Sequence, residues 1–270
     1  MLVAGCENRP DEENRAEIAV TNSYLGCAAL DLCGDDTDVL CLAPPGMCPG
    51  HFDISPSQIK HLCDCRILLL FDFQKQVEQT LSRVKDRGLK TILVGEPGGL
   101  CVPKTYLAIC REVCDVLSSE YPKSKVRYQQ RLEVIEKDLA LLREELIEKM
   151  RQAGISSAKV LASGHQADFV SWLGLETIAT FAGSDIETVA GIEQCIRKAE
   201  GQDVRFVVAN KQEGTALAKA LAERLGAKAV VFGNFPELRG QASGFHALLR
   251  ANVDALLRVN AGDLLEVAIQ

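Results

Sequence analysis

Four side chains of the sequence carry the sulfur and nitrogen atoms that bind transition metals, and each lies in or beside a predicted loop. Cys48 and His51 are three positions apart in residues 47–51 (Met-Cys-Pro-Gly-His). A Cys-x2-His spacing is short enough for both side chains to reach one ion. Cys101 lies in a Gly-rich loop, and His165 stands just after a predicted strand. Together the four make a set of two sulfur and two nitrogen ligands, which suits zinc or another borderline divalent ion.

Two carboxylates could support such a metal site, and a simpler interpretation of the same residues is also open. Asp53 and Glu213 could each orient an imidazole by hydrogen bonding. The alternative is that His51 and His165 are polar loop residues and that the cysteines are buried or disulfide-bonded. The chain has 11 cysteines, but they lack the short spacings of small secreted disulfide frameworks. His61 and His246 fall on predicted helices away from the loops, where surface positions are expected.

The loops are positioned by strands and helices that alternate along the chain. Eight short apolar runs predict strands, at residues 17–20, 39–43, 66–71, 91–94, 160–162, 177–181, 204–209 and 228–232. Alternation with helices predicts parallel sheets, which bind ligands at the loops leaving the carboxyl ends of the strands. The candidate loops are therefore residues 47–51, 95–101, 163–165 and 209–213.

Residues 123–153 predict one long amphipathic helix. Apolar side chains recur in steps of three and four from Tyr128 to Met150, and most other positions are charged. At 1.5 Å per residue the helix would be roughly 45 Å long, which is longer than one small lobe. We therefore predict a spine helix with an α/β lobe on each side of it. A partner-binding coiled coil is the alternative.

Composition narrows the classes of function. The 270 residues are 47% hydrophobic, with a formal net charge of -7 and no Lys/Arg-rich block, so we expect no nucleic-acid partner. No apolar run reaches the roughly 18 residues that a membrane span needs. Neither a G-x-S-x-G motif nor a phosphate-binding GxxxxGK[ST] loop is present. Residues 95–99 (Gly-Glu-Pro-Gly-Gly) could cradle an anion, and a Cys48/His165 nucleophile pair is conceivable, but we predict that the protein is not an enzyme.

The N-terminal residues suggest an exported lipoprotein. Val3-Ala4-Gly5-Cys6 matches the cleavage site of a bacterial lipoprotein signal, although a basic start and an apolar stretch do not precede it. The polar residues 7–15 suit a tether between an anchor and a folded body. We expect lipid anchoring through Cys6, and an ordinary frayed N-terminus is the alternative.

Local runs add a resemblance to a known family. Pro44-Pro45-Gly46, then Pro49 and residues 52–59, resemble the loop "PPG..PH.YEP.PSDI", and residues 220–228 resemble the run "AiAeetGak". Over residues 16–260 the chain resembles the zinc/manganese substrate-binding lipoproteins of bacterial ABC importers. The resemblance implies two α/β lobes, a joining helix, a metal ion in the cleft between them and little movement on closure.

The resemblance is poor at the metal ligands. The family's three histidine positions fall on Gly50, near Gly98 and on His165, and its carboxylate positions fall on Asn210 and near Gly233. Only His165 is retained in place. The donors Cys48, His51 and Cys101 lie in the same loops and are our predicted substitutes.

These observations lead to one predicted organisation and three hypotheses. We predict a lipoprotein-like N-terminus and tether (1–15), an N-terminal lobe (16–121), a spine helix (122–154) and a C-terminal lobe (155–270). The first hypothesis is an extracytoplasmic, membrane-anchored monomer that delivers a transition metal, zinc above others, to an ABC permease and its ATPase. The second is the same receptor with a metal chelate or another small ligand, and the third is an α/β enzyme.

Overall fold

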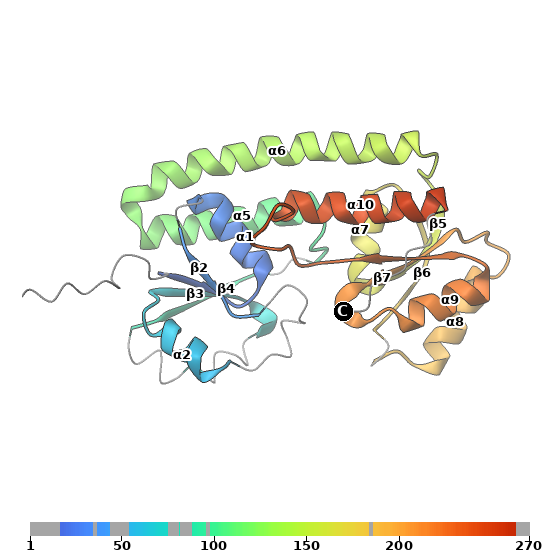
Figure 1. The fold of residues 1–270 in the computed structure, drawn as a ribbon, viewed down its shortest axis with the longest axis horizontal. Coiled ribbons are helices and arrows are strands. Elements are labelled where there is room, and N and C mark those ends of the chain that lie inside the picture. Colours follow the sequence, from blue (N-terminus) through green and yellow to red (C-terminus); the bar gives the residue numbers. More distant parts are fainter. Residues whose placement is uncertain are drawn as a thin grey trace, which may run out of the picture.

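Two parallel β-sheets form the cores of two lobes in the computed structural model, which describes residues 17–34, 37–43, 54–74, 81, 88–95, 98–183 and 186–262 (Figure 1). The first sheet has the order β2-β1-β3-β4 and the second β6-β5-β7-β8, and every pairing is parallel. The strands are β1 (Ile18–Val20), β2 (Val39–Cys41), β3 (Ile67–Phe71), β4 (Lys90–Val94), β5 (Lys159–Ser163), β6 (Glu176–Phe181), β7 (Phe206–Asn210) and β8 (Lys228–Phe232). The predicted fold class is confirmed, and all eight strands lie at the predicted places.

The strand orders fix where loops converge. In each sheet the chain runs outward to one edge and then returns past its first strand, so the direction of winding reverses between β1 and β3 and between β5 and β7. In open parallel sheets, ligands bind outside the carboxyl ends of the strands at such a reversal. The segments after β5 and β7 are the short helices η3 (Gly164–Gln166) and η4 (Lys211–Glu213), which carry two of the predicted site residues.

Helices cover both sheets, and local sequence explains several of their ends. They are α1 (Ser23–Cys33), α2 (Pro56–Leu62), α5 (Pro103–Glu120), α7 (Ala167–Trp172), α8 (Val189–Ala199), α9 (Ala216–Leu225) and α10 (Phe245–Ala261), with short 3-10 helices η1 (Asp72–Gln74) and η2 (Pro122–Ser124). Asn22 caps α1 by accepting a bond from the Leu25 amide, and Ser55 with Gln58 forms a capping box on α2. β3 is buried along its whole length, as its uninterrupted Ile/Leu run predicts.

The spine helix is α6 (Lys125–Gln152), and it runs along both lobes in Figure 1. It begins slightly later than predicted because residues 122–124 form η2. Its buried side chains are those of the predicted apolar stripe: Tyr128, Ile135, Leu139, Leu142, Leu146 and Met150. They pack against α1 and α5 of the first lobe and against α10, so one helix contributes to a core shared by both lobes.

A second connection between the lobes is the crossing segment, residues 233–244, which follows β8 and returns to the first lobe (Figure 1). Leu238 packs on Gly26 of α1, where an added Cβ would lie 2.9 Å from a Leu238 methyl group. At the start of α10, the ring of Phe245 stacks on Tyr106, with ring centroids 4.0 Å apart and planes 4° from parallel. The last helix therefore completes the core of the first lobe although it follows the second lobe in sequence.

Three further findings concern membrane-spanning helices, the cysteines and His246. No helix among the described residues is both long and apolar enough to cross a membrane. The nine described cysteines all carry free thiols, and most are buried. Cys6 and Cys48 lie outside the described residues. His246, expected at the surface, is half-buried, because α10 packs on the first lobe.

Candidate functional site

His165 and Glu213 come together at the reversal point of the second sheet, just after β5 and β7. The Nε2 atom of His165 lies 3.5 Å from Oε1 of Glu213. The Ser163 hydroxyl donates a short hydrogen bond to the other carboxylate oxygen, Oε2. The imidazole is 67% exposed and the carboxylate side chain 16%. A fixed carboxylate thus holds an accessible imidazole at the surface of the second lobe.

Tight turns at the strand ends produce this arrangement. η3 and η4 each follow their strand without an intervening residue, so His165 and Glu213 stay close to the sheet. Gly214 ends η4 with φ +85, a left-handed conformation that glycine adopts at no steric cost, and α9 begins two residues later. The pairing of His165 with the predicted carboxylate Glu213 follows from these two turns.

Behind this pair lies a cluster of buried amide side chains. Nε2 of Gln166 donates to Oδ1 of Asn210 at 3.3 Å and to Oδ1 of Asn234 at 2.7 Å. Asn252 of α10 donates to the Gly233 carbonyl at 3.0 Å and accepts from the Gly233 amide at 2.9 Å. Among these amides, only Asn210 is a site residue predicted from the sequence. Gln166 and Asn234 could have been found from their places, since each stands at the end of a predicted strand or just beyond it.

Cys101 reaches this cluster from the first lobe. Its thiol is fully buried and donates to the Gly233 carbonyl at 3.1 Å and to Oδ1 of Asn234 at 3.4 Å. Burial raises the pKa of Cys101 well above the usual range of a thiol, so the protonated form is held. In this geometry Cys101 is a hydrogen-bond donor that joins the two lobes.

The remaining predicted ligands, Cys48 and His51, and the alternate Asp53 lie outside the described residues. Within the described parts of the chain, no group of three or more His, Cys, Asp or Glu side chains is placed to hold a metal ion. The structure therefore gives two members of a potential ligand set, His165 and Glu213, and leaves the set as a whole a prediction.

The Gly-rich loop after β4 is poorly suited to an anion. The Gly95 amide donates to both carboxylate oxygens of Glu112, at 3.2 and 3.3 Å, so it is not free for a phosphate. Gly99 faces the carboxylate of Asp168, whose Oδ2 would lie 2.9 Å from a Cβ added there. Two acidic side chains beside the loop oppose the binding of a negative ligand.

The carboxyl ends of β1 and β3 carry an uncharged network in the first lobe. Oε1 of Gln74 accepts hydrogen bonds from the Thr21 hydroxyl at 2.6 Å and from Nδ2 of the Asn22 side chain at 3.2 Å. The Phe71 amide donates to the same oxygen at 3.2 Å. All three polar side chains are buried. This network fixes the strand ends of the first lobe and supplies no charge.

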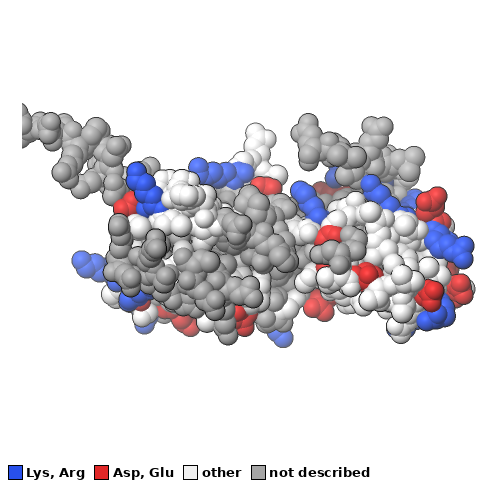
Figure 2. All heavy atoms as spheres, turned by 90° about the horizontal axis from the view of Figure 1, so that it is seen from below, with Lys and Arg blue, Asp and Glu red and all other residues white. Residues whose placement is uncertain are grey.

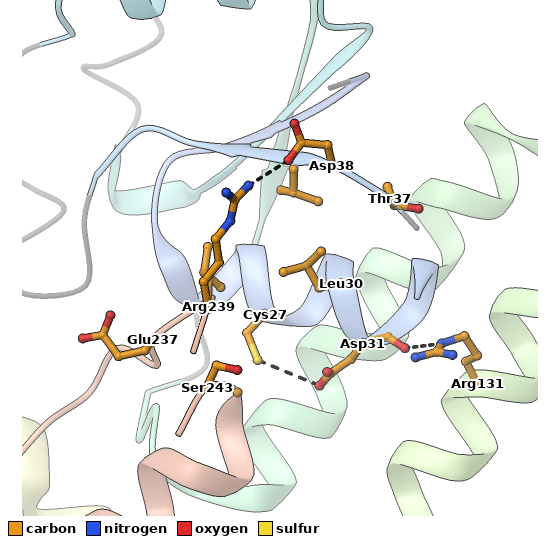
Figure 3. Close-up of a pocket in the computed structure, with 12 residues that line it drawn as sticks. Cys27, Leu30, Asp31, Thr37, Asp38, Arg131, Glu237, Arg239 and Ser243 are labelled. Carbon is orange, nitrogen blue, oxygen red and sulfur yellow. Dashed lines mark hydrogen bonds and ion pairs between the residues drawn. The ribbon is translucent and has the colours of Figure 1, made fainter. Parts of the chain in front are cut away.

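A cavity of about 740 Å³ lies away from these residues, between α1, the spine helix and the crossing segment (Figure 3). Four charged residues on its walls, Asp31, Asp38, Arg131 and Arg239, have side chains that are bonded to protein groups. Nη2 of Arg239 lies 3.1 Å from Oδ1 of Asp38, and Nε of Arg131 donates to the Asp31 carbonyl at 2.5 Å. The Asp31 carboxylate accepts from the Tyr106 hydroxyl at 2.6 Å. The pair of Asp38 and Arg239 joins the first lobe to the crossing segment, and we assign no ligand to this cavity.

Figure 2 shows the face opposite the spine helix, where described side chains of both signs lie on each lobe. Among the atoms drawn as described, no broad surface of one sign dominates this view.

Comparison with known proteins identifies a family for this chain. A family model for the periplasmic component A of the zinc-uptake complex, ZnuA, matches residues 101–259, more than half of the chain. The fold is similar to the Cd-bound periplasmic metal binding protein from Candidatus Liberibacter asiaticus, with a TM-score of 0.75 and 11% identity over 90% of this chain and 98% of that one. The Mn-bound form of that protein gives the same values.

A crystal structure of ZnuA is also similar, with a TM-score of 0.73 and 17% identity over 92% of this chain and 99% of that one. No curated protein sequence matches this chain. At these identities the solved structures establish the fold, whereas the family model matches the sequence itself.

Proposed function

Because the chain belongs to the family of periplasmic A components of zinc-uptake complexes, we propose that it is the extracytoplasmic receptor of an ABC importer. It captures a transition-metal ion between its two lobes, zinc above others, and delivers the ion to a permease. The similar solved structures include Cd-bound and Mn-bound forms, which supports the same class of ligand here. It acts by binding and release, without catalysing a reaction.

The spacing of His165 and Glu213 is the observation that carries this proposal. Two ligands of one tetrahedral zinc ion, each about 2.0–2.1 Å from the metal, stand roughly 3.3 Å apart. The 3.5 Å between Nε2 of His165 and Oε1 of Glu213 is close to this value. Since Ser163 occupies the other carboxylate oxygen, Oε1 is the one that faces the metal. The second lobe thus supplies two ligands that are already oriented.

The first lobe supplies the other ligands in this proposal. Cys48 and His51, three residues apart, complete a tetrahedral set with His165 and Glu213. Cys101 remains a proposed ligand from sequence, but it would have to lose its proton and its bonds to the second lobe. We therefore rank Glu213 ahead of Cys101. Asp53 remains an alternate, whereas Asn210 is bonded to Gln166.

Metal analysis of protein purified under reducing conditions tests this function. One zinc ion per chain is expected, and His165→Ala should weaken zinc binding in a competition titration with a chromophoric chelator. The double variant Cys48→Ser/His51→Ala should weaken it further. The proposal fails if the protein holds no stoichiometric metal and the double variant binds zinc as tightly as the parent.

The cellular setting follows from the same proposal. Cys6 carries a lipid that holds the monomeric receptor at the outer face of the cell membrane, where it meets the permease and its ATPase. Labelling with a fatty acid should mark the parent protein and not Cys6→Ser. A zinc-loaded receptor should stimulate the ATPase of its reconstituted permease, and metal-free protein should not.

A second candidate is the same receptor with a different small ligand, such as a metal chelate. The neutral amides Asn210 and Asn234, at strand ends where carboxylates are expected from the family, favour it. A thermal shift produced by a zinc chelate but not by free zinc would support this alternative over the first.

A further inference from the structure

The position of Gln166 joins three strand ends of the second lobe. Gln166 follows His165 directly and is fully buried. Its Nε2 atom bonds to Asn210, at the end of β7, and to Asn234, just beyond β8. One side-chain amide therefore fixes the turn that carries His165 against the two neighbouring strands.

Asn234 extends this connection in two directions. Its main-chain amide donates to Oε1 of Gln212 at 3.3 Å, and Gln212 is the neighbour of Glu213. Its side-chain oxygen also accepts from the Cys101 thiol of the first lobe. A chain of hydrogen bonds thus runs from the neighbour of one proposed ligand to the neighbour of the other, with a branch to the first lobe.

We propose that Gln166 and Asn234 are positioning residues, which hold His165 and Glu213 at metal-ligand spacing and tie that spacing to the first lobe through Cys101. This inference rests on the proposed function. Residues that orient metal ligands from outside typically change metal affinity 10- to 100-fold when mutated. Neutral amides suit this role because they direct hydrogen bonds without adding a buried charge.

The oxygen and the nitrogen of the Gln166 side-chain amide differ in their bonding. Its Oε1 atom is buried and has no hydrogen-bond partner among the described residues. An unpaired buried acceptor is unfavourable. The favourable bonds of the Gln166 side chain are therefore those of Nε2, which join its turn to Asn210 and Asn234.

The test uses Gln166→Met, which keeps the length of the side chain and removes its hydrogen bonds. Cobalt(II) replaces zinc as the probe, because its visible absorption reports the geometry of the ligands. We expect at least a tenfold loss of cobalt affinity and a changed absorption band. The control is Leu221→Ala, a core truncation on α9 that lowers thermal stability and leaves the hydrogen bonds of Gln166 and Asn234 intact. It should keep the parent absorption band and affinity.

A second measurement needs no metal. In metal-free protein, amide hydrogen exchange in residues 164–166, 211–214 and 99–102 should rise together in Gln166→Met and stay at the parent level in Leu221→Ala. Parent-like exchange in Gln166→Met overturns the inference, whatever the protein binds. Absence of cobalt binding by the parent protein would count against the proposed function, while the exchange result would still decide the role of Gln166.

Discussion

Ser163 holds one oxygen of the Glu213 carboxylate and leaves the other facing His165. Because Ser163 bonds Oε2, the other oxygen, Oε1, has a defined position beside the His165 imidazole. Cys101 illustrates the opposite case, since a cysteine in a Gly-rich loop looks the same in sequence whether its thiol is free or bonded. Its burial and its carbonyl partner decide its chemistry.

Removal of the Ser163 hydroxyl tests the carboxylate directly. Ser163→Ala should lower zinc affinity roughly 10- to 100-fold, because the freed carboxylate can rotate away from the metal. Its melting temperature should stay near that of the parent, since alanine fits the same space. Ser171→Ala, an exposed change on α7, is the control. Equal zinc affinities for the two variants would contradict the role of Ser163.

Asp31 predicts a pH effect on stability. Burial is the main cause that raises the pKa of Asp31, against the opposing influence of the Tyr106 hydrogen bond and of His246 and Arg131. The folded state therefore keeps a proton that the unfolded chain has already lost, so stability falls as the pH rises above the ordinary aspartate pKa. A side chain of the same shape that does not titrate should remove this loss of stability.

Asp31→Asn keeps an acceptor for Tyr106 and removes the titration. Urea unfolding measures the free energy of unfolding of both proteins at pH 4 and at pH 7.5. The difference between variant and parent should shift in favour of the variant at the higher pH. Asp138→Asn, an exposed change on the spine helix, should follow the parent at both values. A gain that is the same at pH 4 and pH 7.5 would show that Asp31 is not the group responsible.

At the scale of the elements, the loop after β4 contacts α7 closely at Gly99 and Asp168. Gly99 has φ +66, and a Cβ there would lie 3.0 Å from the Cβ of Asp168, which no side-chain rotation can move. Gly226 has almost the same φ, +65, with open space around it. Gly226→Ala should cost about 1–2 kcal/mol for backbone strain alone, and Gly99→Ala should cost more.

Denaturant unfolding measures the loss of unfolding free energy in each variant. The amount by which the loss in Gly99→Ala exceeds the loss in Gly226→Ala is the steric contribution of Asp168. Asp168→Ala keeps the Cβ but removes the carboxylate, so in the Gly99→Ala background it should restore part of the lost stability. Equal costs for Gly99→Ala and Gly226→Ala would mean that the loop moves away from α7 freely.

The elements were largely predictable because each leaves a local pattern. The apolar run of β3 and the periodic stripe of α6 depend only on neighbours along the chain. The site was less predictable, since it depends on contacts between distant residues. Gln166 and Asn234 are 68 positions apart, and no spacing rule links them. His165 could be named because it stands at a strand end, whereas its pairing with Glu213 needed the order of the strands.

For the whole molecule, Phe245 tests how far the lobes depend on each other. Phe→Ala changes in a core typically cost about 3–5 kcal/mol. Phe245→Ala should also raise hydrogen exchange around Tyr24 and Tyr106 in the first lobe, because their rings lose their partner. Phe169→Ala, equally buried but packed on Phe232 within the second lobe, should leave that region protected. Protection of the first lobe in both variants would contradict this dependence.

The crossing segment also sets an order of events in the making of the protein. Tyr24 and Tyr106 can meet Phe245 only after the strands and helices of the second lobe, which precede Phe245 in sequence, have been synthesised. A nascent first lobe therefore presents an incomplete apolar face and cannot close its core ahead of the rest. The two lobes are therefore coupled in folding, because the first lobe can reach its final packing only when the start of α10 is available to it.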